Sequence, residues 1–170
     1  TAYEIGVRLV GSEMCIRDRD YTAHPEKQGM GPIGTPAQAI TGLVMHSTLA
    51  MSEAGLPLGL FSQDIWARPE TASQLTPQER RRLSIEDKES YKWLKALDRT
   101  VALTPEGTQV VTIGDSESDI FELFNHARSL NTDLLIRAAQ NRSVSEPEVG
   151  LLWSVLGSRP VAGHLKVNVP

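Results

Sequence analysis

Three acidic residues close together in the chain are the strongest candidates for chemistry. Asp115 follows the apolar run at 109–113 (QVVTI), and Glu117 and Asp119 lie within the next turn. Open α/β sheets bind ligands at the carboxyl ends of their strands, and clustered carboxylate oxygens suit a hard cation such as Mg²⁺ or Mn²⁺. The same residue types also cap helices and complement the helix dipole, so the spacing alone leaves both interpretations open.

The residues around Asp115 predict a strand–helix–strand unit. The β-branched run at 109–113 is typical of a buried strand, and Asp119–Leu130 has the apolar spacing of a helix that packs on one side. Leu134–Ala138 predicts a second strand. Because such a connection is a right-handed crossover, the two strands are expected to be parallel, with Asp115 in the turn between the first strand and the helix.

A β-hairpin is expected upstream of this unit. Residues 20–38 are interrupted by Gly and Pro and predict a loop, whereas Thr41–Met51 and Leu56–Arg68 predict two strands joined by a tight turn. Since both faces of the first of these strands carry apolar residues, we expect a sheet that is covered on both sides. The elements together predict a mixed α/β sheet.

The remaining segments are more polar or lie near the end of the chain. Residues 69–83 predict a linker, and the pair Ser84 and Asp87 predicts a capping box that starts a helix extending to about Asp98. Leu151–Leu156 predicts a short helix, and Val161–Val169 alternates like a strand.

Composition places the chain among soluble globular proteins. It has 170 residues, a formal net charge of −4, 40% hydrophobic residues and one Cys, which excludes an internal disulfide framework. No apolar run is long enough to span a bilayer, and the expected location is the cytoplasm. The mild acidity gives no general attraction to nucleic acid, so binding to DNA would depend on local residues.

The first 19 residues differ from the rest of the chain. Their end, RLVGSEMCIRDR, resembles peptides that arise when sequencing-adaptor DNA is translated, and we interpret residues 1–19 as a non-native tail. The expected organisation is therefore a tail at 1–19, a partial catalytic domain at 20–158 and the start of a β-rich insertion at 159–170.

The segment Ile113–Ile120 (IGDSESDI) is similar to motifs of two families. It resembles a late motif of haloacid dehalogenase-like phosphatases, in which the positions of Asp115 and Asp119 hold Mg²⁺. Those enzymes also need a nucleophilic aspartate in a DxDx(T/V) string at the end of their first strand. Asp18–Thr22 (DRDYT) has this form, but it overlaps the segment 1–19 that we interpret as a non-native tail. A phosphatase remains an alternative.

A second resemblance covers almost the whole chain from Asp20 to Pro170. It is carried by Asp20–Pro25 (DYTAHP), Gly29–Gly34 (GMGPIG), His46–Ala50 (HSTLA), Gly55–Leu60 (GLPLGL), Trp66–Arg68 (WAR), Lys88–Leu94 (KESYKWL), Asp115–Ile120 (DSESDI) and Leu135–Arg142 (LIRAAQNR). In their order and spacing these blocks resemble the cut-and-paste bacterial DDE transposases of the insertion-sequence-four type.

This resemblance implies a ribonuclease H-like fold and metal-dependent DNA cleavage and strand transfer. Three carboxylates of such a site hold two Mg²⁺ or Mn²⁺ ions roughly 4 Å apart, and Asp115 matches one catalytic, metal-binding aspartate. Arg137 and Arg142 match a basic loop that contacts transposon-end DNA. The intact parent protein would act as a homodimer on DNA in the bacterial cytoplasm, without a membrane.

The other two carboxylates do not carry over. Cys15 stands where the family has its first aspartate, and a thiolate is a soft ligand that suits Mg²⁺ poorly. Asp18 is near that position, and Asp20 matches a later, non-catalytic one. The glutamate is expected beyond Pro170, so we expect a truncated domain that is itself inactive. A non-catalytic remnant that binds DNA weakly is a further alternative.

Two other features have simpler structural interpretations. The run Arg80, Arg81 and Arg82 is expected to be part of a solvated linker rather than a DNA site. His46 is expected to be a hydrogen-bonded histidine within the sheet rather than a catalytic residue.

Overall fold

The computed structural model describes residues 9–13, 19–20, 28–33, 40–70, 75–145, 149–164 and 166. The chain divides into two compact units, of which the first ends at Arg137 and the second begins at Ala138. The domain bounds that we expected from the sequence, including the boundary at 158/159, stay a prediction. Each unit is described separately.

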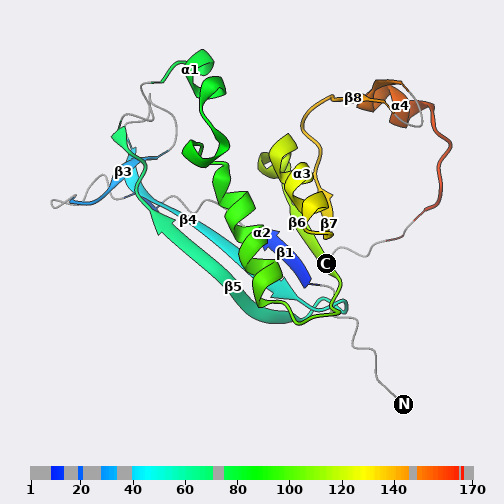
Figure 1. Cartoon of the computed structure of the whole chain (residues 1–170), viewed down its shortest axis with the longest axis horizontal. Helices are drawn as coiled ribbons and strands as arrows, with labels where there is room; N and C mark the ends of the chain where they lie inside the picture. The colour runs from blue at the N-terminus through cyan, green and yellow to red at the C-terminus, as the bar shows by residue number, and fades with distance from the viewer. Residues whose placement is uncertain are drawn as a thin grey trace. The chain divides into compact units, whose positions relative to one another are not determined.

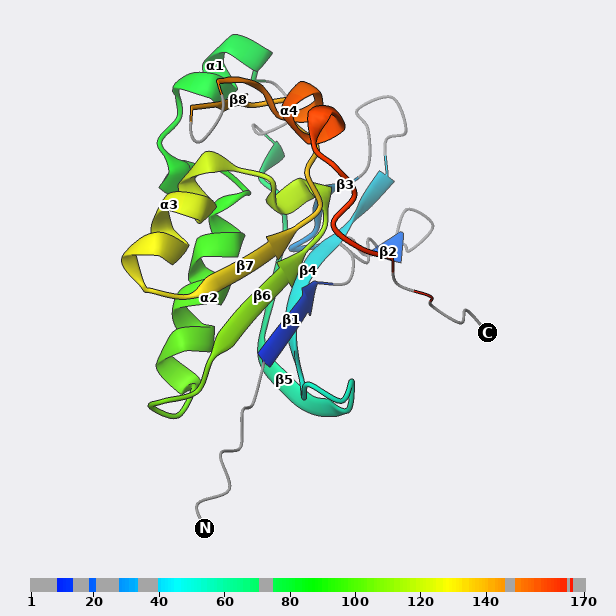
Figure 2. The ribbon, with the colours of Figure 1, turned by 90° about the vertical axis from the view of Figure 1, so that its right-hand side faces the viewer.

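The first unit is built on one mixed sheet (Figures 1 and 2). Its main strands, in spatial order, are β5 (Pro57–Trp66), β4 (Ile40–Met51), β1 (Leu9–Glu13), β6 (Val110–Gly114) and β7 (Asp133–Ile136). β4 is antiparallel to both β5 and β1, whereas β6 is parallel to both β1 and β7. Two short strands, β2 (Arg19–Asp20) and β3 (Gly31–Ile33), also pair with β4. The predicted mixed α/β class is confirmed.

Two helices cover one face of this sheet, as Figure 2 shows. They are α2 (Tyr91–Leu103) and α3 (Phe121–Ser129), and their buried side chains form the core with those of Leu134 and Ile136 on β7. The buried members of this core are Trp93, Leu94, Leu97, Leu123 and Ala127. The parallel crossover that we expected around Asp115 is present, since α3 connects β6 to β7.

The opposite face of the sheet is less covered than the sequence predicts. Met45 pairs with Ile65, and Ile113 pairs with Leu135, so these residues share the face opposite the helices. Ile65 is 58% exposed and Leu135 is 60% exposed. The expectation of a sheet covered on both sides is therefore wrong for the described residues, because apolar side chains on both faces of β4 do not by themselves provide a second layer.

Local hydrogen bonding explains two differences between the structure and the sequence-based expectation in the segment between β5 and α2. The predicted linker contains a helix, α1 (Pro77–Arg82), because Thr76 and Glu79 form a capping box and Pro77 occupies the first turn. The side chain of Ser84 donates to Asp87 over 3.0 Å, but this pair starts only a 3-10 turn, η3 (Ile85–Asp87). The main helix begins later, at Tyr91.

The second unit contains a small hairpin and a helix. β8 (Ser143–Val144) pairs antiparallel with β9 (Gly150–Leu151), and α4 (Leu152–Ser158) follows directly. The described residues at 161–164 and 166 form no strand, although the alternation predicts one. None of the helices described here combines the length and apolar character that a membrane span requires.

His46 lies in the core between β4 and α2. Its ring meets the ring of Trp93 edge to face at 5.2 Å, and the residue is only 4% exposed. Burial, and after it the nearby charge of Lys92, lower the pKa of His46 from 6.5 to about 4. The imidazole is therefore neutral at pH 7, in keeping with a histidine that packs within the sheet.

This buried histidine predicts a loss of stability in mild acid. Between pH 6.5 and about 4 the unfolded chain binds a proton at His46 that the folded chain does not, so the free energy of unfolding falls by up to about 3 kcal/mol across that window. Urea denaturation at several pH values measures it. His46→Gln should flatten this part of the profile, whereas His164→Gln, at an exposed site, should leave it unchanged.

Candidate functional site

Asp115 stands at the carboxyl end of β6, near the middle of the sheet. β6 lies between β1 and β7 and runs parallel to both, so the ends of three parallel strands meet at this edge. Asp115 itself is exposed. This is the edge at which open α/β sheets bind ligands, and it is where the sequence predicts Asp115 to lie.

The turn after β6 fixes the backbone of Asp115. Oδ1 of Asp115 accepts a hydrogen bond from the backbone N–H of Glu117 over 2.9 Å and so caps the 3-10 turn η4 (Ser116–Ser118). The hydroxyl of Ser118, a fully buried residue, donates to the carbonyl of Asp115 over 2.6 Å. Asp115 therefore caps this turn, as the helix-cap interpretation of the sequence predicts. A carboxylate has several lone pairs, so the cap does not exclude metal binding.

Gly114 makes this tight turn possible. A Cβ at Gly114 would lie 2.3 Å from Oγ of Ser118 and 3.1 Å from Cδ1 of Ile136. Neither neighbour can move freely, because Ser118 is fully buried and Ile136 packs against the core. Only glycine fits at the end of this strand.

The two neighbouring carboxylates differ in their surroundings. Glu117 is exposed, and its Oε2 lies 3.5 Å from Nζ of Lys92. Asp119 is only 6% exposed. Within the described ranges, no three His, Cys, Asp or Glu residues are grouped so as to hold a metal ion. Asp115 is therefore one potential ligand, and the described residues do not complete a two-metal site around it.

β1 reaches the same edge of the sheet as Asp115. Ser12 of β1 pairs with Ile113 of β6, and the two strands are parallel, so β1 ends beside the turn that carries Asp115. No pattern in the sequence predicts this strand. Cys15 and Asp18 lie outside the described residues, as does the side chain of Asp20 in β2. The interpretation of residues 1–19 as a non-native tail stays a prediction.

The two arginines that the sequence singles out belong to different units of the structure. Arg137 directly follows β7, is exposed, and donates its backbone N–H to the carbonyl of Gly114 over 3.1 Å. It therefore lies at the same edge as Asp115. Arg142 belongs to the second unit, where its carbonyl accepts from the backbone N–H of Leu152 over 2.9 Å.

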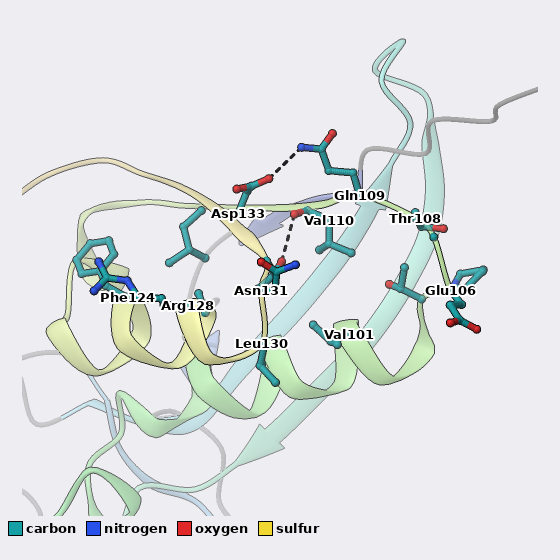
Figure 3. Close-up of a pocket in the computed structure, with 16 residues that line it drawn as sticks. Val101, Glu106, Thr108, Gln109, Val110, Phe124, Arg128, Leu130, Asn131 and Asp133 are labelled. Carbon is teal, nitrogen blue, oxygen red and sulfur yellow. Dashed lines mark hydrogen bonds between the residues drawn. The ribbon is translucent and has the colours of Figure 1, made fainter.

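A pocket of about 810 Å³ lies at the other end of the parallel strands (Figure 3). Its wall is formed by the ends of α2 and α3 and by the starts of β6 and β7. The side-chain amide of Gln109 donates to Asp133 across the two strand starts over 2.9 Å. Because this pocket faces away from the strand ends that carry Asp115, we assign it no part in chemistry at that residue.

Lys92 is the residue near Asp115 that sequence analysis missed. It is 6% exposed, and its ammonium lies 5.6 Å from the ring centre of Trp93 as well as beside Glu117. In the sequence it has the spacing of Lys88 and Lys95, which predicts one polar face, so no sequence pattern indicates that Lys92 is buried. No protein-family model matches the sequence, and no curated protein matches it.

The contact between Gly114 and Ser118 predicts a large effect of a single methyl group. Gly114→Ala should lower the free energy of unfolding by about 2 kcal/mol or more, because the new Cβ overlaps Ser118 and the edge of β7. Gly157→Ala is the control, since a Cβ there meets nothing within 4 Å and alanine favours a helix. Equal urea midpoints for Gly114→Ala and the unmodified chain would contradict this packing.

Proposed function

We propose that this chain is part of the catalytic domain of a DDE transposase of the insertion-sequence-four type. In this proposal the sheet is ribonuclease H-like, Asp115 is a catalytic metal ligand, and the parent protein cleaves and joins transposon-end DNA. The observation that carries the proposal is the position of Asp115, an exposed carboxylate in a rigid turn at the meeting point of three parallel strand ends.

The strand arrangement supports the fold part of the proposal. β1, β4 and β5 form an antiparallel meander, and β6 and β7 extend the sheet on the other side of β1 in the parallel direction. Helices α2 and α3 precede β6 and β7 and pack on the same face. This order of hairpin, helix, strand, helix and strand is the one that the resemblance implies.

The charges at the edge support the role of this region in binding DNA. Arg137 is held beside the turn of Asp115 by its backbone bond to Gly114. An arginine at that position can bind a DNA phosphate through two parallel hydrogen bonds, while the carboxylate holds a cation that contacts the same DNA backbone. Mg²⁺ or Mn²⁺ would supply activation of the attacking oxygen, and Asp115 would contribute one of the ligands.

The phosphatase alternative gains no support from the sheet. In the described part of the chain, the antiparallel strands β4 and β5 stand next to β1, where a doubly wound phosphatase would continue with parallel strands. Assaying a generic phosphomonoester with Mg²⁺ separates the two functions. Turnover that Asp115→Asn abolishes would favour the phosphatase.

The metal role of Asp115 predicts coupling to the position of Cys15. Cys15→Asp places a second carboxylate at the position where the resemblance has an aspartate, so it should tighten Mn²⁺ binding by about tenfold. Electron paramagnetic resonance of free Mn²⁺ measures the affinity. Combining Cys15→Asp with Asp115→Asn should remove the gain.

A matched control tests whether the gain is local. Asp133→Asn makes the same chemical change at the other end of the parallel strands, and Cys15→Asp should keep its full effect in that background. If Cys15→Asp leaves Mn²⁺ affinity unchanged, or if its gain survives Asp115→Asn, the proposed metal site is wrong.

The same reasoning predicts that the 170-residue chain performs no strand transfer. Cys15 replaces one expected carboxylate, and the described residues hold no group of three ligands. Incubation with end-bearing DNA and Mg²⁺ or Mn²⁺ should leave that DNA intact on a denaturing gel. Cleavage that depends on the metal and disappears in Asp115→Ala would show that the chain is active by itself.

A further inference from the structure

Helix α1 carries three successive arginines on the surface of the first unit. Arg80, Arg81 and Arg82 are all exposed, and no residue of α1 is buried. In the described part of the chain, their side chains form no ion pair or hydrogen bond. Each guanidinium therefore keeps its donors available to a partner.

The cap holds α1 in shape without help from the core. Thr76 accepts from the backbone N–H of Glu79 over 3.3 Å, and Glu79 accepts from the backbone N–H of Thr76 over 2.8 Å. The hydroxyl of Thr76 also donates to Glu79, and these hydrogen bonds lower the pKa of the Glu79 carboxyl. The one acidic residue of the helix is thus engaged at its start, so the rest of its surface is basic.

α1 lies at the end of the sheet that carries Asp115. In Figure 2, β6 and β7 point toward the end of the sheet at which α1 lies. Figure 1 shows α1 at the same end. The chain runs from α1 through η3 to the start of α2, and Lys92 in the first turn of α2 lies 3.5 Å from Glu117 in the turn of Asp115. The arginines and the carboxylate therefore share one end of the unit.

We infer that α1 is a second DNA-contacting element, which binds the phosphate backbone of a duplex beside Asp115. Successive residues of a helix are about 100° apart, so the side chains of the three arginines point in different directions over a broad arc. Side chains spread in this way are better placed to contact DNA phosphates than to read base edges. Guanidinium groups bind phosphate through paired hydrogen bonds. The choice of DNA as the polyanion rests on the proposed function.

The salt dependence of DNA binding tests this inference. The full chain is titrated with a fluorescent duplex of mixed sequence over a range of salt concentrations, and the slope of log affinity against log salt is compared between variants. Replacing all three arginines by Gln should make the slope shallower by about 2 to 3, because each phosphate contact contributes about 0.9. Arg81→Gln alone should change it by about 1.

Arg128→Gln is the matched control for Arg81→Gln. Arg128 is an exposed arginine in α3 and lines the pocket at the other end of the parallel strands, so its loss should change neither affinity nor slope. Replacing the three arginines by Lys keeps the charge and should restore most of the slope. This variant shows that the Gln effect comes from lost phosphate contacts and not from altered folding.

Three results would overturn the inference: an unmodified chain that binds no duplex at low salt, a triple Gln variant that binds like the unmodified chain, and an equal effect of Arg128→Gln. These outcomes are independent of the Mn²⁺ measurement. If α1 fails while Asp115 still couples to Cys15→Asp, the proposed function stands without this element. If the coupling fails while the slope changes, α1 binds DNA in a protein without the proposed metal site.

Discussion

The close packing of Gly114 against Ser118 determines where the carboxylate of Asp115 can be. β6 has to turn within one residue of its end, and this is possible because Gly114 brings no Cβ into the space that Ser118 and Ile136 occupy. Three hydrogen bonds then converge on the turn, from the Ser118 hydroxyl, the Glu117 amide and the Arg137 amide. A carboxylate that binds a cation is most effective when it is held in place beforehand, and this turn provides that rigidity.

Lys92 links the hydrophobic core to this turn. A lysine that is 6% exposed must keep its charge solvated or paired, and here the ring of Trp93 and the carboxylate of Glu117 stabilise it. The same charge helps to keep His46 neutral. If α2 moved along the sheet, the buried ammonium of Lys92 would lose its contact with Glu117. The position of the helix and the position of the turn therefore depend on each other.

The sequence predicts the elements that local patterns determine and misses those that need distant contacts. The periodicity of residues 109–130 places β6, the turn of Asp115 and α3 within about two residues of their observed bounds. Leu9–Glu13 shows no such pattern, and it becomes a strand because β4 and β6 offer hydrogen bonds on both sides. α1 could have been found, because Thr76, Pro77 and Glu79 are the residues of a capping box. The bond that ties Arg137 to Gly114 has no sequence signal, since it joins two strand ends that are distant in the chain.

Charged residues lie at both ends of the parallel strands of the first unit. The chain as a whole has a net charge of −4, so a long-range field would repel a polyanion. At the end with the pocket, Glu106 and Asp133 add to the negative ends of the dipoles of α2 and α3. At the other end, Arg137 lies at the same edge as Asp115, and helix α1 lies at that end of the sheet. Since charges beyond about 10 Å are screened at moderate salt, a duplex that approaches α1 experiences mainly the charges close to that helix, and an acidic chain can still attract DNA at one place.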